Sequence, residues 1–96
     1  MPNKINIRQR QVVYRKAIKR FGKVNQMVKA IEEMSELTKV LTKILGLGTT
    51  VSREELIEEI ADVTIMMEQL RLMYNINDEV CEMMDSKIRR LENRIR

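Results

Sequence analysis

The sequence predicts an all-α fold in which four helices pack in a bundle-like arrangement. Four long stretches carry apolar residues three and four positions apart, which is the period of an amphipathic helix. Helix-breaking residues are rare, with three Gly and one Pro in 96 residues. Hydrophobic residues make up 44% of the chain and charged residues 33%, a balance typical of a folded helical protein. A chain of this length forms one domain, which spans residues 1–96.

The first predicted helix spans residues 6–21 within a basic N-terminal segment, residues 1–22. Its apolar stripe consists of Ile7, Tyr14, Ala17, Ile18 and Phe21. Gly22 follows directly, where a helix is expected to end. Arg and Lys side chains lie opposite the stripe, so this basic face is either solvated or docks on an acidic partner or nucleic acid.

The second predicted helix begins at Val24 or Asn25 and ends at Leu45, and with it begins a core over residues 24–95. Apolar residues cover so much of its circumference that we expect the helix to be largely enclosed. The segment 46–50, which contains two glycines, then turns the chain back.

The third predicted helix begins after Ser52, which with Glu55 forms a capping-box pattern, and ends near Tyr74. It carries two apolar stripes on different sides. Such a helix needs two packing partners, and in a domain this small we expect one of them to be a second subunit.

The fourth predicted helix follows a turn, with Asn77 or Asp78 as its N-cap, and runs close to the C-terminus. Its apolar stripe consists of Val80, Met84, Ile88, Leu91 and Ile95. Three basic residues, spaced three and four apart, form a row beside this stripe: Lys87, Arg90 and Arg94. The row either complements the helix dipole or binds phosphate groups.

Two acidic motifs occur within the apolar helices. Glu33 and Glu36 lie three residues apart on the second helix, and Glu59 and Asp62 do so on the third, so each pair projects from one face. If the two helices pack antiparallel, four carboxylates converge. Such a cluster resists burial unless a cation neutralises it, and hard divalent ions such as Mg²⁺ prefer oxygen ligands. The sequence therefore predicts a metal site.

Charge is unevenly distributed along the chain. Residues 1–23 carry eight Lys or Arg and no acidic residue, whereas residues 52–85 carry two Arg and ten Asp or Glu. Basic ends could bind nucleic acid or a phosphorylated small molecule. With no His and one Cys, zinc sites, Cys–His nucleophiles and Ser–His–Asp triads are excluded. No apolar run suits a signal peptide or a membrane span, so we expect a cytoplasmic protein without a membrane partner.

The order Glu-Glu-x-x-Glu, a gap of a little over twenty residues and then Glu-x-x-Asp resembles the MazG-like all-α nucleoside triphosphate pyrophosphohydrolases. This superfamily includes the dimeric all-α dUTPases. The matching segments are residues 32–36 and 59–62. Two further features also resemble short phage and bacterial members: Phe21-Gly22 followed by Gln26 ahead of the first motif, and the helix over residues 87–94. The resemblance covers roughly residues 14–95.

The resemblance implies Mg²⁺-dependent hydrolysis of nucleoside or deoxynucleoside triphosphates to monophosphate and pyrophosphate, a reaction of nucleotide-pool clean-up. The implied metal ligands, for Mg²⁺ or also Mn²⁺, are Glu33, Glu36, Glu59 and Asp62. The implied catalytic residues are Glu32, Glu33 and Glu36, with Glu32 orienting a water or holding a second ion. The implied substrate contacts are Lys87, Arg90 and Arg94 to the phosphates and Gln26 to the base or sugar. Members act as homodimers or as homotetramers built from dimers, so we expect association through the helices.

A second function class stays open. A small basic helical protein could contact nucleic acid or a regulatory partner, with its carboxylates in structural ion pairs, or act as an oligomerisation scaffold. The motifs favour the enzyme, because neither contains a Lys or Arg to form such pairs. Nucleic acid is therefore not the expected partner. The preferred base and sugar, the number of metal ions and the choice between dimer and tetramer also stay open.

Overall fold

The computed structural model of the chain describes residues 3–46 and 50–96. These residues form four α-helices and no strand: α1 (Ile7–Phe21), α2 (Lys23–Leu45), α3 (Arg53–Met73) and α4 (Asn77–Arg94). The predicted all-α, four-helix class is therefore confirmed, and the helix ends lie close to their predicted positions. Residues 47–49 of the expected turn lie outside the described residues. No helix in the described part of the chain is long and apolar enough to cross a membrane.

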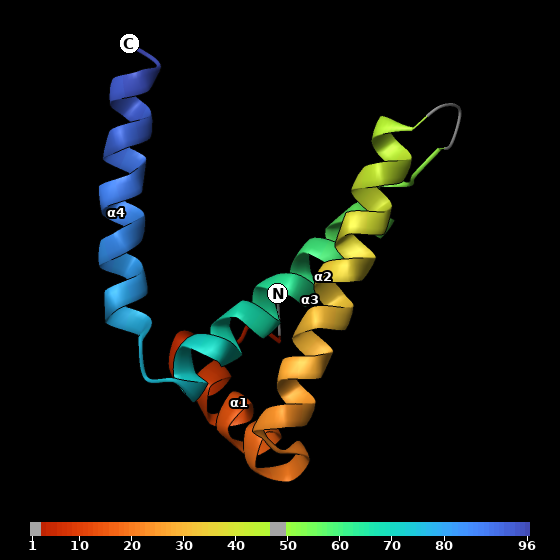
Figure 1. Cartoon of the computed structure of the whole chain (residues 1–96). Coiled ribbons are helices and arrows are strands. Elements are labelled where there is room, and N and C mark those ends of the chain that lie inside the picture. The colour runs from red at the N-terminus through yellow and green to blue at the C-terminus, as the bar shows by residue number, and fades with distance from the viewer. Residues whose placement is uncertain (1–2, 47–49) are drawn as a thin grey trace.

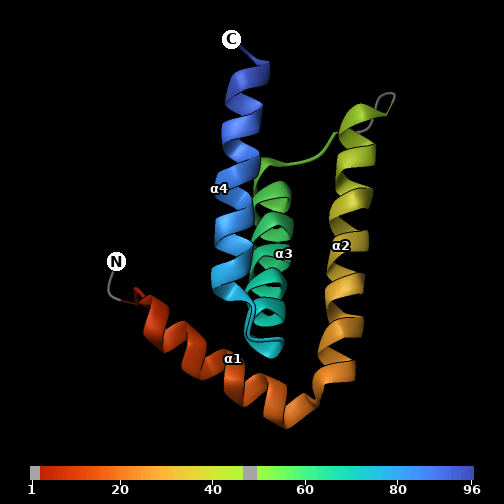
Figure 2. The same cartoon turned by 60° about the vertical axis from the view of Figure 1, so that its left-hand side comes forward.

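The two longest helices, α2 and α3, run antiparallel and make the largest helix–helix contact (Figure 1). Helix α1 crosses one end of this pair and contacts both helices (Figure 2). Helix α4 contacts α3 alone among the described helices and diverges from the other three (Figure 1). One chain thus forms a three-helix unit with a fourth helix beside it, rather than a closed four-helix bundle.

The helix ends follow local sequence signals with one exception. Asn6 and Gln9 form a full capping box at the start of α1, and Ser52 accepts the backbone N–H of Glu55 at 3.1 Å at the start of α3. Between α1 and α2 the chain turns at Gly22, whose φ of 90° lies in the left-handed region that glycine adopts readily. The exception is the start of α4.

The predicted N-cap of α4 at Asn77 or Asp78 is wrong. Asn75 adopts a φ of 53°, and the N-cap is Ile76, which makes no side-chain capping bond. Asn77 and Asp78 are instead the first helical residues. The carboxylate of Asp78 therefore lies in the first turn, where it interacts favourably with the helix dipole rather than capping a backbone N–H.

The core of one chain is small. Its buried apolar residues come from α1, α2 and α3, and they are Tyr14, Ala30, Val40, Met66 and Met73. Two buried amides lie among them, and Nε2 of Gln26 on α2 donates to Oε1 of Gln69 on α3 at 2.8 Å. This bond satisfies polar groups that burial would otherwise leave unpaired.

A polar contact joins α1 to α3. The Tyr14 hydroxyl donates to Oε1 of Glu68, and Arg10 lies 3.4 Å from the other carboxylate oxygen. Burial, together with the hydrogen bond to Glu68 and the charge of its carboxylate, raises the pKa of Tyr14 to about 12. The contact fixes α1 across the end of the α2–α3 pair.

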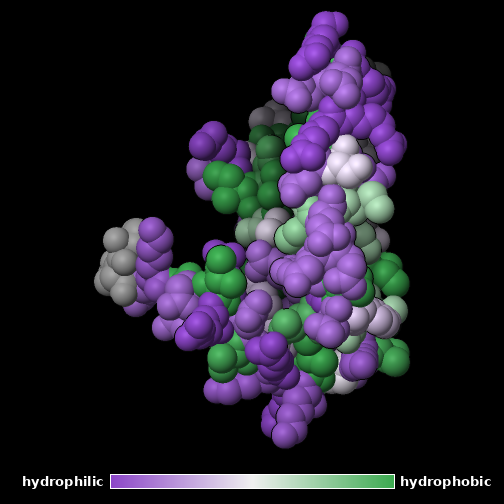
Figure 3. Space-filling view, turned by 90° about the vertical axis from the view of Figure 1, so that its left-hand side faces the viewer, coloured by the Kyte–Doolittle hydropathy of each residue, from purple (hydrophilic) through white to green (hydrophobic). Residues whose placement is uncertain are grey.

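Much apolar surface is left exposed by this arrangement. Four of the five predicted stripe residues of α4 are exposed, namely Met84, Ile88, Leu91 and Ile95. Helix α2 was expected to be largely enclosed, but Val24, Ile31 and Leu45 are exposed at 59–86%. That prediction is wrong for a single chain, because α4 does not cover the α2–α3 pair. Figure 3 shows hydrophobic side chains at the surface among hydrophilic ones on the face that carries α4.

Candidate metal centre

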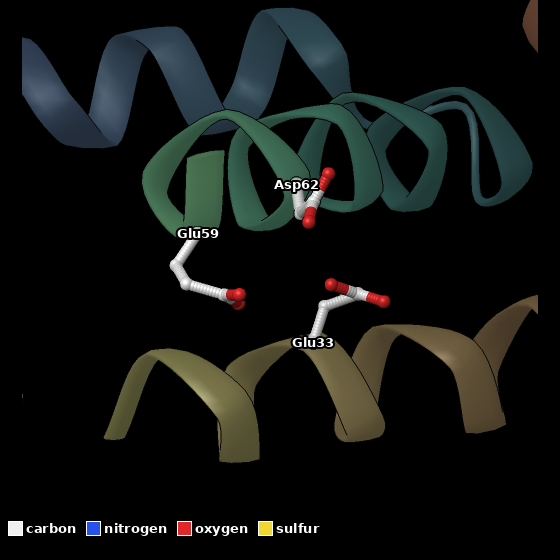
Figure 4. A group of neighbouring side chains, drawn as sticks. All are labelled: Glu33, Glu59 and Asp62. Atoms are coloured by element: carbon white, nitrogen blue, oxygen red, sulfur yellow. The ribbon is translucent and has the colours of Figure 1, made fainter. Parts of the chain in front are cut away.

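The two acidic motifs meet where α2 and α3 pack against each other. Glu33 projects from α2 toward Glu59 and Asp62 on α3 (Figure 4). Each of the three residues offers a carboxylate oxygen that lies within 4.8 Å of the other two. The i and i+3 spacing on α3 and the antiparallel packing together produce this convergence, as the sequence predicted for these three residues.

The carboxylates of this cluster are partly enclosed. Only 14% of the Glu33 side chain is exposed. In Glu59, Oε2 is buried and has no hydrogen-bond partner within residues 3–46 and 50–96. A buried, unpaired carboxylate oxygen is costly. A hard cation would use that oxygen as a ligand, so the donor set of three carboxylates fits Mg²⁺ or Mn²⁺.

The electrostatics of the cluster follow from burial and repulsion. Burial raises the pKa of Glu59, and the charges of Asp62, Glu33 and Glu36 raise it further. Burial also raises the pKa of Asp62, followed by the charge of Glu33, and Lys29 opposes the shift. Both carboxyl groups therefore hold a proton more tightly than in water. A bound cation would neutralise the same negative charges.

A lysine outside the motifs also contacts the acidic cluster. Nζ of Lys29 lies 3.1 Å from Oε1 of Glu33, four residues further along α2. Its hydrogen bond to Glu33 and the charge of that carboxylate raise the pKa of Lys29. Sequence reasoning missed this residue, although the i, i+4 spacing of Lys and Glu was a usable signal. One exposed lysine leaves the three-carboxylate cluster with a net negative charge.

The remaining acidic residues of the first motif lie beside this cluster. Glu36 is exposed and is not part of the three-residue group, but its charge contributes to the raised pKa of Glu59. Glu32 is exposed, and its charge contributes to the raised pKa of Lys29. Both therefore belong to the same electrostatic neighbourhood on α2.

The predicted substrate contacts are not brought to the cluster within one chain. Helix α4 lies on the opposite side of α3 from the carboxylates (Figure 4), and its three basic residues are exposed: Lys87, Arg90 and Arg94. Gln26 is buried in the core, where its amide donates to Gln69. Neither group contacts the acidic cluster in the described hydrogen bonds and ion pairs.

Comparison of the chain with protein-family models, with curated proteins and with solved structures finds no match. The resemblance to the MazG-like enzymes therefore rests on the sequence of the two motifs alone.

Proposed function

We propose that the protein hydrolyses nucleoside or deoxynucleoside triphosphates to monophosphate and pyrophosphate in a Mg²⁺-dependent reaction. The observation that carries the proposal is the convergence of Glu33, Glu59 and Asp62, with a buried Glu59 oxygen that lacks a partner in the described part of the chain. The order and spacing of the motifs that supply these residues resemble the pattern of the MazG-like pyrophosphohydrolases. The raised pKa values of Glu59 and Asp62 add support, because such groups favour a bound cation.

In this proposal both α2 and α3 contribute residues to the metal site. Glu33, Glu59 and Asp62 would hold the ion, with Glu36 adding a fourth negative charge from the next turn of α2. Glu32 would orient the water. Bound Mg²⁺ would supply charge neutralisation for the phosphates and a water of lowered pKa. The chain then needs no nucleophile of its own.

The proposal includes a second copy of the chain. The accessible surface of one chain is 8333 Å², whereas a compact monomer of 11.4 kDa exposes about 5,800 Å², leaving an excess of roughly 2,500 Å². Obligate dimers bury about 2,000–5,000 Å² in total, which is about 1,000–2,500 Å² for each chain. The exposed stripe of α4 and an open, mainly apolar groove of about 500 Å³ between α1 and α3 are the surfaces available for that contact.

Association would also supply the phosphate contacts. Within one chain α3 separates the basic row of α4 from the acidic cluster (Figure 4). In a dimer or tetramer Lys87, Arg90 and Arg94 of one copy would reach the cluster of another. Mixing an Asp62→Asn variant with a Lys87→Gln/Arg90→Gln/Arg94→Gln variant should then restore activity that each lacks alone. If both variants are inactive alone and the mixture stays inactive after subunit exchange, the shared site is rejected.

Association itself is tested on α4. Leu91→Glu introduces a charge into the exposed apolar stripe and should shift the protein to monomer in sedimentation velocity. Arg89→Glu places the same side chain on the other side of the helix and should leave the assembly intact. A wild-type protein that sediments as a monomer at all concentrations tested would reject the proposed assembly.

The reaction is tested by incubating the protein with Mg²⁺ and each common NTP and dNTP, and resolving the products. Monophosphate plus pyrophosphate, abolished by EDTA and restored by Mg²⁺ or Mn²⁺, is the expected result. Diphosphate plus phosphate would keep the metal site and reject the proposed reaction. The absence of turnover with every nucleotide would reject the enzyme and favour the class of small basic binding proteins, for which the Lys29–Glu33 ion pair is then a structural contact.

A further inference from the structure

The outward side of α1 carries a concentrated positive charge. Six residues of this helix are basic and exposed, and Arg10 among them pairs with Glu68. We call the other five the α1 basic face: Arg8, Arg15, Lys16, Lys19 and Arg20. Arg8, Arg15 and Lys19 are spaced seven and four residues apart, so they form one row, and Lys16 and Arg20 form a second row beside it. Tyr14 points the other way and is buried against α3. The face therefore lies away from the core.

Among the described residues, no carboxylate forms an ion pair with this face. The first carboxylate in the sequence is Glu32, so α1 has no acidic residue to pair with it. Among the described residues the ion pairs are Arg10 with Glu68 and Lys29 with Glu33, and neither involves the face.

Helix energetics do not favour the face either. Like charges four residues apart, as in Arg15 with Lys19 and Lys16 with Arg20, destabilise a helix. Arg8 lies in the first turn, where the helix dipole disfavours a cation. The dipole favours only Lys19 and Arg20, in the last turn. An anionic partner that covered the face would relieve the repulsion in both rows.

The shape of the face suits a polyanion of regular spacing. From Arg8 to Lys19 it extends over about 17 Å of helix axis, and phosphates recur about every 3.4 Å of axis along one strand of duplex DNA. Helix α1 lies at one end of the molecule, where its outward side is not covered by α2, α3 or α4 (Figure 2). One apolar residue, Val12, lies within the rows, whereas a helix that inserts into a lipid surface needs a whole apolar face.

We propose that the α1 basic face binds the sugar–phosphate backbone of a nucleic acid, without reading its bases. Arginine and lysine contacts to phosphate give affinity that is independent of sequence and falls with salt. The proposal is independent of the proposed hydrolysis, because the face and the acidic cluster lie on different helices. It departs from the sequence-based expectation that nucleic acid is not a partner.

The test is fluorescence anisotropy with labelled duplex DNA, single-stranded DNA and duplex RNA over a range of salt concentrations. The face variant is Arg8→Gln/Arg15→Gln/Lys19→Gln. The matched control is Lys87→Gln/Arg90→Gln/Arg94→Gln, which lowers the net charge of +4 by the same three units. Glutamine is a good helix former, so both variants should keep their helical circular dichroism.

The face variant should bind at least about tenfold more weakly at low salt, and its log–log salt slope should be shallower by about 3. The control should bind within about twofold of the wild type and keep the slope, since its cations are off the face. In the nucleotide assay the two variants should show the opposite pattern if the proposed function holds. The control variant loses hydrolysis, and the face variant keeps it. The nucleic acid that binds most tightly is the class of partner that the face selects.

Three results would overturn the proposal. Equal loss in both triple variants would mean that net charge alone causes binding. Absence of binding at low salt would reject the surface. Binding to vesicles containing anionic lipid, without binding to any of the three nucleic acids, would assign the face to a membrane surface instead.

Discussion

The α2–α3 interface and the α1 basic face both gather charges of one sign, but they differ in their surroundings. At the interface an oxygen of Glu59 is buried, and burial raises the pKa values of Glu59 and Asp62. The five cations of the α1 basic face are exposed, so water and salt screen their repulsion. Like charges therefore cost much more at the interface. We expect single substitutions to have large effects in the acidic cluster and small ones on α1.

The largest expected effect is loss of the proposed hydrolysis in Asp62→Asn. The substitution keeps the shape of the side chain but removes one negative charge from the three that converge, so metal-dependent turnover should fall by about 100-fold or more. The control is Glu58→Gln, on the same helix but outside the cluster, which should retain most of the activity. Wild-type turnover by Asp62→Asn would reject the metal assignment.

The next effect concerns stability without metal. Because the folded-state pKa values of Glu59 and Asp62 are raised, these groups stabilise the fold at low pH, below their ordinary values of 4.5 and 3.8. That stability is lost as the pH rises through the raised values. Glu59→Gln should therefore raise the Tm of the metal-free protein at neutral pH and flatten its dependence on pH.

Magnesium should relieve the same repulsion in the wild type. Millimolar Mg²⁺ should raise its Tm by binding the folded state, and in Glu59→Gln this increase should be reduced or lost. Thermal unfolding with and without Mg²⁺ over a range of pH measures both effects. A Tm for metal-free Glu59→Gln below that of the wild type would contradict the view that the cluster is strained.

A smaller effect is expected where α1 meets α3. Tyr14→Phe removes the hydrogen bond to Glu68 and should destabilise the fold by about 1 kcal/mol in denaturant unfolding. The raised pKa of Tyr14, about 12 against an ordinary 10.0, means that wild-type stability should fall as the pH rises from 10 to 12. Tyr14→Phe should show a weaker decline in this window, and an identical decline would assign the loss to other groups.

The smallest effect is expected on the basic face. Arg15→Gln removes one like-charge pair with Lys19, four residues away, and should stabilise the protein by about 0.2–0.5 kcal/mol at low salt, and by less at high salt. Denaturant unfolding at two salt concentrations measures the change. A destabilisation above about 1 kcal/mol would mean that Arg15 makes a favourable contact that the exposed face does not suggest.

Sequence periodicity predicted the helices and the core of the acidic site. The spacing of Glu59 and Asp62 fixes their shared side of α3, and antiparallel packing then brings Glu33 to them. The spacing did not predict that Glu36 would be exposed outside the three-residue group, because residues three apart still differ in direction and α2 is not enclosed by a fourth helix.

The sequence did not predict which helices pack against each other over long range. The stripe of α4 indicates that its apolar side should be covered, but periodicity does not say by which helix or by which chain. The short link from Met73 to Asn77 lets α4 diverge from α3, and its basic row then lies away from the carboxylates. Gln26 shows the same limit, because the sequence did not predict that its amide would be buried and would donate to Gln69.

The buried amide pair has a consequence for the alignment of the two central helices. Glu33 follows Gln26 by seven residues on α2, and Asp62 precedes Gln69 by seven residues on α3. The amide pair and the carboxylate pair are thus two helical turns apart on both helices, in the same antiparallel register. Sliding α3 by one turn, about 5.4 Å, would leave both amides buried without each other and would move Asp62 away from Glu33. The Gln26–Gln69 bond therefore fixes the register of the two helices, that is, which residues of α2 and α3 lie opposite each other.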